Sequence, residues 1–414
     1  MSRVLVVNTG SSSIKYRLFG MADRTGDRTG GPAVLASGLL ERIGEAASTL
    51  THRVPGADPV VRELKVADQR EGFDRILEAF GGGLRGELGG GLRGELAGIG
   101  HRVVHGGERF TAPTLLDAEA LEAIREQIPL APLHNPSNLL GIEVTMAAFP
   151  ATPQVAVFDT AFHLTMPPRA YRYAIPRELA SRFGIRRYGF HGTSHAFVSR
   201  RAAEHLGRPL ADLNLVTMHL GNGASVAAVA GGRCIDTSMG LTPLEGLVMG
   251  TRSGDLDPAI PLYLQREAGL SVDQVDALLN RESGMLGLAG ANDMREVERR
   301  AAAGDERARE ALDVYCYRVR KYVGAYAAAL GRLDALVFTA GVGENSEAVR
   351  AGVCRGLEGF GVLLDPERNR ERSGLPRTVS ADGGAVAVLV VPTDEELEIA
   401  EQTLATVTAR SPDP

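Results

Sequence analysis

The pattern of apolar and polar positions at the start of the chain predicts a β-hairpin. Val4–Val7 is a continuous apolar run, typical of a buried strand, and Ile14–Phe19 alternates apolar with cationic residues, typical of a half-buried one. Residues 8–13 between them are glycine or small polar residues. Such a turn directs backbone N–H groups and hydroxyls toward one point, which suits a phosphate or its metal ion. A plain tight turn has the same composition, so this segment alone does not distinguish a phosphate-binding turn from an ordinary one.

A second hairpin of the same design is expected half a chain later. Residues 213–229 predict strand, small polar turn and strand, with the turn at Gly221–Ser225. A third loop, Ala340–Asn345, follows the short apolar strand Ala335–Thr339 and precedes a helix expected to begin near Ser346. This loop has neither the Gly-Lys-Ser/Thr ending of a Walker A loop nor the glycine spacing of a dinucleotide fingerprint. Together the three loops favour a nucleotide bound between two related lobes.

Length and composition exclude several classes of protein. The 414 residues exceed the usual size of a single core, so two domains are expected. A formal net charge of −6 argues against a nucleic-acid-binding protein. No apolar run approaches the length of a membrane span, and the amino terminus lacks the order of a signal peptide. We therefore expect a cytoplasmic protein with no membrane or nucleic-acid partner.

The cysteines and the repeats add little chemistry. Cys234, Cys316 and Cys354 are odd in number and form no CxxC motif, so they are predicted to be reduced, mostly buried thiols, with a regulatory thiol as the minor alternative. Residues 23–31 repeat Asp-Arg-Thr-Gly, and residues 81–96 contain the same eight-residue, glycine-rich sequence twice. Exact glycine-rich repeats cannot bury a core, so both segments are predicted to be loop expansions.

The motifs that carry the chain's identity occur in a fixed order. After the first hairpin come Gly100–Glu108, Pro132–Pro136, Phe158–His163, Arg186–His195, Asp236–Gly240, Met249–Gly254 and Thr393–Leu397. In this order, and over nearly the whole chain, they resemble the signatures of the acetate kinase family. The resemblance implies an α/β fold with two ribonuclease-H-like lobes and a central active-site cleft, as in the superfamily of acetate and sugar kinases, heat-shock ATPases and actin. Residues 1–160 would form the N-terminal lobe, with the last helix packed back on it, and residues 161–414 the nucleotide-binding lobe.

Two arginines are the first candidates for catalysis. Phosphoryl transfer to a carboxylate brings two anions together, so the site needs cations and a divalent metal. Arg102 and Arg252 have apolar or glycine-rich neighbours, unlike a solvated surface arginine, and their planar forks suit carboxylate and phosphate oxygens. The resemblance places both at the substrate.

A histidine and an aspartate complete the catalytic set. The resemblance makes His191 the stabiliser of the transferring phosphoryl group and leaves His195 a structural residue. Their i, i+4 spacing would also suit zinc, but no glutamate follows His191 as in HExxH. Asp159 ends the apolar run Val155–Phe158, where a simple turn cap is the alternative, and the family gives it a proton-transfer role. Because a carboxylate substrate is already ionised, we instead expect Asp159 to orient an arginine or the waters of the metal.

The metal is expected to be Mg²⁺, with Mn²⁺ as a substitute, held by one or two protein oxygens. Asn8 and Glu395 are the candidate ligands. Thr393 and Glu396 have capping-box spacing, so Glu396 is expected to serve its own helix and to leave Glu395 for the metal. Asp394 stands where the family usually has asparagine.

The substrate pocket follows from the resemblance. The methyl pocket of the family corresponds to Val104, Leu133, Phe190 and Pro243. Small aliphatic walls suit a two-carbon acid, so propionate should be used less well. Asn135 is the predicted cap of the helix that Pro136 begins, and His134 before it either contacts phosphate or braces that loop.

The nucleotide contacts implied by the resemblance lie in four segments. They are Lys15, then His219, Leu220, Gly221, Asn222 and Gly223, then Asp293, Met294 and Arg295, and finally Gly341, Val342, Gly343, Glu344 and Asn345. Ala340 stands where the family frequently has glycine, and Leu164 where it frequently has glutamine.

The implied function is reversible in-line phosphoryl transfer between ATP and acetate, giving acetyl phosphate and ADP. A propionate kinase with the same mechanism is the near alternative. A non-catalytic nucleotide sensor of the same fold is the distant one, and it should lack the set of Arg102, His191 and Arg252. The amphipathic pattern of residues 305–330 fits either an internal helix or a dimer contact, and the family favours a homodimer.

Overall fold

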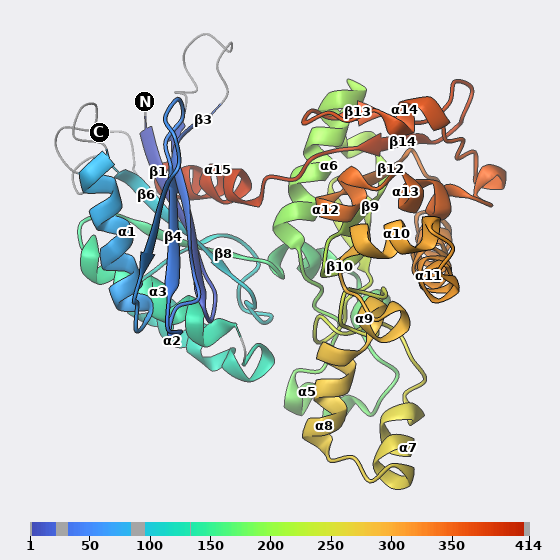
Figure 1. The fold of residues 1–414 in the computed structure, drawn as a ribbon, viewed down its shortest axis with the longest axis horizontal. Helices are drawn as coiled ribbons and strands as arrows, with labels where there is room; N and C mark the ends of the chain where they lie inside the picture. Colours follow the sequence, from blue (N-terminus) through green and yellow to red (C-terminus); the bar gives the residue numbers. More distant parts are fainter. Residues whose placement is uncertain (1, 22–31, 84–95, 133, 410–414) are drawn as a thin grey trace. The chain divides into compact units, whose positions relative to one another are not determined.

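The computed structural model describes residues 2–21, 32–83, 96–132 and 134–409, so most of both repeat segments lies outside the described residues (Figure 1). The chain divides into two compact units. Residues 1–161 and 394–414 form the first unit, and residues 162–393 form the second. A 3₁₀ turn, Ala161–Thr165, carries the chain from one unit to the other.

The first unit is built on an eight-stranded sheet with the order β5-β4-β3-β2-β1-β6-β8-β7. β1, β2 and β3 pair antiparallel, which confirms the first predicted hairpin, whereas β6 runs parallel to β1 and to β8. The strands are β1 (Ser2–Thr9), β2 (Ser13–Met21), β3 (Ala33–Glu41), β4 (Ser48–Arg53), β5 (Val60–Leu64), β6 (Leu96–Val103), β7 (Thr114–Leu115) and β8 (Gln154–Phe158).

Helices cover both faces of this sheet (Figure 1). Val4 and Val6 of β1 pack in the cluster that contains Ile399 of the last helix, whereas Leu5 and Val7 belong to the core on the opposite face. Burial on both faces explains why the run is continuous rather than alternating. The helices are α1 (Gln69–Gly83), α2 (Ala118–Glu126), α3 (Asn135–Ala148) and α15 (Glu395–Thr408), with a 3₁₀ turn at Ile128–Leu130.

The second unit repeats the plan with a six-stranded sheet in the order β11-β10-β9-β12-β14-β13. Its first three strands again pair antiparallel, and the next two run parallel to the first. Both sheets therefore place the third, second and first strands beside the two parallel ones, which confirms the expected ribonuclease-H-like fold. The strands are β9 (Asn214–Leu220), β10 (Ala224–Ala230), β11 (Arg233–Thr237), β12 (Ala335–Thr339), β13 (Arg377–Thr378) and β14 (Ala387–Val390).

Several helices of the second unit pack directly on its sheet, among them α6, α11 and α12. The helices of this unit are α4 (Pro168–Tyr171), α5 (Arg177–Phe183), α6 (Gly192–Leu206), α7 (Ala259–Glu267), α8 (Val272–Ala277), α9 (Gly284–Ala289), α10 (Met294–Ala302), α11 (Glu306–Leu330), α12 (Ala340–Asn345), α13 (Glu347–Cys354) and α14 (Pro366–Arg370). Short 3₁₀ turns lie at Leu210–Asp212 and Glu358–Phe360, and a π turn at Leu278–Glu282.

Two local expectations can be compared with these helices. The side chain of Ser346 accepts from the Val349 N–H at 3.0 Å and caps α13, which confirms a helix start near this residue. The segment expected as the third loop is instead the short helix α12. The three cysteines are free and buried. Among the described residues, no helix has both the length and the apolar character needed to cross a bilayer.

Candidate active site

An arginine between two carboxylates marks one edge of the first sheet. β6 and β8 are parallel neighbours, so their carboxyl ends bring Arg102 and Asp159 together. Arg102 Nη2 donates to Asp159 Oδ2 at 2.5 Å, and its Nε lies 3.7 Å from Glu395 Oε2 at the start of α15. Burial acts to lower the pKa of Arg102, but the carboxylates of Asp159, Glu395 and Glu396 outweigh it and the pKa is raised. Arg102 is therefore held as a cation with one-fifth of its side chain exposed.

The hairpin residue Lys15 faces the other acid of this helix start. Lys15 stands opposite Asn8 in the β1–β2 register, and its ammonium forms an ion pair with Glu396. Burial acts to raise the pKa of Glu396, but Lys15 and Arg17 outweigh it and the pKa is lowered. The structure thus uses Lys15 to hold α15 on β2.

The expected capping box of this helix is wrong. The N-cap is Asp394 rather than Thr393, and its carboxylate accepts from the Leu397 N–H at 3.0 Å. Asp394 also accepts from Arg17 at 2.8 Å. The physical reason is that β2 presents two cations to the first turn of α15, so Glu396 binds Lys15 instead of turning back to its own helix.

The candidate metal ligands have suitable chemistry. Asn8 offers an amide oxygen that makes no side-chain hydrogen bond within the described residues, and Glu395 is a one-quarter exposed carboxylate. No group of three His, Cys, Asp or Glu side chains in the described ranges is arranged to hold a metal ion. Both observations fit Mg²⁺, which takes few protein ligands and completes its shell with phosphates and water.

The start of α3 fixes the ends of β1 and β6. Asn135 is fully buried and exchanges two hydrogen bonds with the backbone of His105, at 3.2 and 3.0 Å. Asn138 accepts from the Val104 N–H at 3.1 Å and donates to the Thr9 carbonyl at 2.8 Å. The expectation that Asn135 caps α3 is therefore wrong, because its amide is already committed to His105. The N-cap is the exposed His134, which makes no side-chain capping bond.

Buried histidines beside this site make stability depend on pH. Burial lowers the pKa of His101 and of His105 to about 4, against about 6.5 in an unfolded chain. Between these values the unfolded chain binds more protons, so the free energy of unfolding is expected to fall as the pH drops from about 6.5 to about 4. Urea unfolding at pH 7.5, 6.0 and 5.0 measures this loss. His101→Gln, which keeps a donor toward Gln154, should flatten the slope, and an unchanged slope would contradict the assignment.

In the second unit, two candidate catalytic residues converge on one glycine. A Cβ added to Gly223 would lie 2.7 Å from Arg252 Nη2 and 3.5 Å from His191 Nε2. His191 has a left-handed backbone, with φ of 58°, at the start of α6. Such a conformation is costly outside glycine and is typical of functional positions. Because Gly223 has no side chain, the turn after β9 leaves space beside Arg252 and His191 in which a ligand could lie.

Arg252 is a half-buried cation that holds no carboxylate among the described residues. Its Nη1 donates to the carbonyl of Pro243 at 2.6 Å. Burial lowers its pKa from the ordinary arginine value, which still leaves the group charged at neutral pH. A half-buried guanidinium without a protein anion is suited to an anionic ligand.

A cavity of about 1060 Å³ in the same unit gathers many of the predicted nucleotide contacts. Those that line it are Gly221, Asn222, Asp293, Met294, Arg295, Gly341, Val342 and Asn345. The others in this unit, His219, Leu220, Gly223, Gly343 and Glu344, are not among the lining residues. The turn Gly221–Gly223 therefore borders the cavity on one side and the pair His191 and Arg252 on the other.

Glu344 has a structural use at the edge of this cavity. Its Oε1 accepts from the backbone N–H of Ala340 at 2.9 Å and of Thr393 at 3.2 Å. Ala340 itself has φ of 64°, a conformation that favours glycine. Glycine, which the resemblance leads us to expect at this position, would adopt this backbone at less cost than alanine.

The residues of the substrate methyl pocket, as predicted from the resemblance, belong to different units of the structure. Val104 is buried in the first unit, and Phe190 is buried in the second. Pro243, also in the second unit, supports Arg252 through its carbonyl. Leu133 lies outside the described residues.

A family model described as the acetokinase family matches residues 3–401 of the chain. The chain belongs to the acetokinase family. Curated relatives include an acetate kinase of Streptomyces griseus, 57% identical and covering 99% of this chain and 97% of its own. Another is an acetate kinase of Syntrophobacter fumaroxidans, 52% identical, with 98% and 97% covered.

Solved structures of two related kinases resemble this chain over nearly its whole length. The crystal structure of Porphyromonas gingivalis acetate kinase has a TM-score of 0.90 and 44% identity, covering 99% of this chain and all of the other. A propionate kinase from Francisella tularensis has a TM-score of 0.88 and 41% identity, covering 98% and 100%. The family predicted from the ordered motifs is confirmed.

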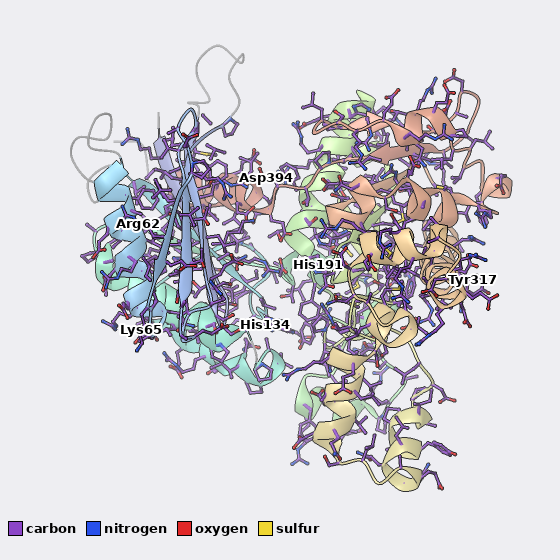
Figure 2. All side chains as sticks on the ribbon, viewed as in Figure 1. Arg62, Lys65, His134, His191, Tyr317 and Asp394 are labelled. Carbon is purple, nitrogen blue, oxygen red and sulfur yellow. The ribbon has the colours of Figure 1, made fainter. Side chains whose placement is uncertain are left out.

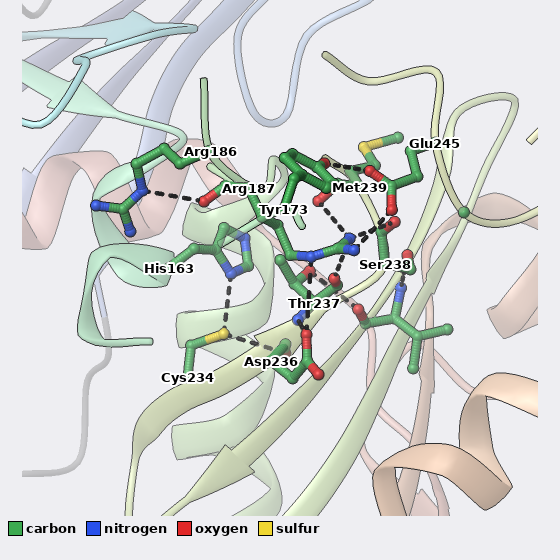
Figure 3. A network of polar contacts seen from close by, with 12 residues as sticks. His163, Tyr173, Arg186, Arg187, Cys234, Asp236, Thr237, Ser238, Met239 and Glu245 are labelled. Atoms are coloured by element: carbon green, nitrogen blue, oxygen red, sulfur yellow. Dashed lines mark hydrogen bonds and ion pairs between the residues drawn. The ribbon is translucent and has the colours of Figure 1, made fainter. Parts of the chain in front are cut away.

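Within this acetokinase chain, sequence reasoning missed the role of Arg187. Its Nη1 donates to the carbonyls of Thr237, Ser238 and Met239, and its Nη2 donates to Glu245 at 2.6 Å (Figure 3). Burial acts to lower the pKa of Arg187, but Glu245 and its other neighbours raise it overall. Arg187 thereby ties the motif Arg186–His195 to the motif Asp236–Gly240.

Sequence reasoning also missed half of the cavity lining. The additional residues are Gly250, Met285, Asn292, Glu298, Arg299, Tyr315, Ser346 and Arg372. Tyr315 is 1% exposed in α11, and its hydroxyl has no hydrogen-bond partner within the described residues. The helical period of α11 predicts that Tyr315 is buried, but no sequence signal places a cavity beside it.

Proposed function

We propose that the protein catalyses reversible phosphoryl transfer between ATP and acetate, giving acetyl phosphate and ADP. The observation that carries the proposal is the Gly221–Gly223 turn. Its first residues border a cavity large enough for a nucleotide, and its last leaves room beside His191 and Arg252. Membership in the acetokinase family supports the choice of acetate as the acceptor.

The chemistry follows from charge. Acetate is ionised at neutral pH, so the barrier comes from bringing two anions together and not from removing a proton. Arg102 would bind the acetate carboxylate, and Asp159 would hold the guanidinium in place. His191 and Arg252 would donate hydrogen bonds to the oxygens of the transferring phosphoryl group. Mg²⁺, or Mn²⁺ in its place, would be held through Asn8 and Glu395 and would neutralise phosphate charge.

Two further expectations belong to this proposal. The buried free cysteines fit a reducing, cytoplasmic location. A homodimer is supported by apolar side chains that α5 and α7 leave exposed, namely Leu179, Phe183, Leu262 and Tyr263. Light scattering after gel filtration would test the dimer, and a monomer at micromolar concentration would contradict it.

The test is formation of acyl phosphate from ATP, trapped with hydroxylamine, with acetate, propionate or butyrate in the presence of Mg²⁺. Acetate should lead propionate by about tenfold or more in kcat/KM, since a small pocket discriminates against one methylene by roughly 1–3 kcal/mol. Equal or faster use of propionate would favour the propionate kinase alternative with the same site. No acyl phosphate from any acid would contradict the proposed function and favour a nucleotide sensor.

A further inference from the structure

A line of four hydrogen-bonded side chains runs behind His191 in the second unit. Thr217 Oγ1 lies 2.7 Å from His195 Nδ1, and His195 Nε2 lies 2.8 Å from Ser225 Oγ. Ser225 Oγ in turn lies 2.9 Å from His191 Nδ1. The hydroxyls come from the neighbouring strands β9 and β10, and the imidazoles from the start of α6 (His191 is labelled in Figure 2).

The donor count gives this line a direction. Thr217 is fully buried, and within the described residues its hydroxyl has no hydrogen-bond partner except His195. If His195 donated through Nδ1, the Thr217 proton would be buried without an acceptor, which is unfavourable. Thr217 therefore donates and His195 Nδ1 accepts.

The remaining protons follow in order. Burial lowers the pKa of His195 well below its ordinary value, and the nearby imidazoles of His163 and His219 act in the same direction, so His195 is neutral. A neutral imidazole has a single N–H, which then lies on Nε2 and is donated to Ser225. The hydroxyl of Ser225 has one proton, and this proton is donated to His191 Nδ1.

We propose that Thr217, His195 and Ser225 are positioning residues that hold His191 with its proton on Nε2. Nε2 is the His191 atom beside Gly223, where Arg252 also lies. The inference rests on the proposed function, in which His191 donates to a phosphoryl oxygen. In this tautomer His191 donates while neutral. The opposite tautomer would turn a lone pair toward an anionic oxygen and would hinder transfer.

Nitrogen NMR of the full-length protein without ligands tests the tautomers directly. With ¹⁵N-labelled histidine, the wild type should show His191 and His195 protonated on Nε2, with the His191 signals assigned from their loss in His191→Gln. Ser225→Ala removes the hydroxyl that donates to His191 Nδ1, so a fraction of His191 protonated on Nδ1 should appear. Thr217→Ser keeps a hydroxyl and should retain the wild-type pattern.

Kinetics of the same variants separate positioning from a purely structural role. Ser225→Ala should lower kcat by about tenfold with the KM values for ATP and acetate within about twofold, and Thr217→Ser should keep the wild-type kcat. Wild-type His191 protonated on Nδ1, or a His191 tautomer unchanged in Ser225→Ala, would overturn the inference even with normal turnover. Nε2 protonation in a protein that forms no acyl phosphate would support the hydrogen-bond line and overturn the proposed function.

Discussion

Arg252→Ala is expected to lower kcat by about 10³-fold or more and to leave the affinity for ATP close to that of the wild type. An arginine that meets the charge of a transferring phosphoryl group contributes on this scale. Arg252 lies beside Gly223 but is not among the residues that line the cavity, so nucleotide binding should not depend on it. Because no protein carboxylate in the described residues pairs with Arg252, its removal strands no buried anion and the variant should fold.

Two matched arginine variants sharpen this test. Arg252→Lys keeps the charge but loses the planar fork, so it should recover only part of the lost rate. Arg372→Ala removes an exposed arginine that lines the cavity, and it should weaken ATP binding with kcat nearly unchanged. Single-turnover rates and ATP titration calorimetry measure the two effects separately. Wild-type kcat in Arg252→Ala, or a tenfold loss of its ATP affinity, would contradict the assigned role.

Short sequence patterns predicted most of the strands and turns that position the candidate site. The run Val4–Val7 became the buried centre of a sheet, and the turn Gly221–Ser225 became the junction of cavity and candidate catalytic residues. These features follow from residues adjacent in the chain, whose strand period and turn composition are direct consequences of backbone geometry. The ordered motifs then predicted the family correctly over the whole chain.

Expectations failed where distant residues decide the local structure. Thr393 and Glu396 have the spacing of a capping box, but Lys15 and Arg17 bind the two acids at the start of α15 across more than three hundred residues of sequence. Asn135 has the character of a helix cap, but its amide is bound to His105 instead. A spacing rule cannot anticipate such partners, because the competing bond comes from an element that only the fold brings near.

The second large effect is expected on the free energy of unfolding when the ion pair of Arg102 and Asp159 is broken. Arg102→Ala leaves the carboxylate of Asp159, which is 1% exposed, without its cation, so the free energy of unfolding should fall by about 3 kcal/mol. Asp159→Ala should cost less, because Glu395 remains near a partly exposed Arg102. The double variant should regain stability relative to Arg102→Ala, since no buried charge is then stranded. Urea unfolding of the four proteins gives the coupling energy.

Activity should not follow stability in this series, and the difference tests what Asp159 does. Arg102→Ala and the double variant should both lose turnover by about 10²-fold or more and bind acetate weakly, because the proposed carboxylate fork is gone. Asp159→Asn keeps an oxygen that accepts from Arg102, so it should retain clearly more activity than Asp159→Ala. A proton acceptor would behave otherwise, because asparagine would then be as inactive as alanine. Equal loss in Asp159→Asn and Asp159→Ala would therefore replace orientation by proton transfer as the role of Asp159.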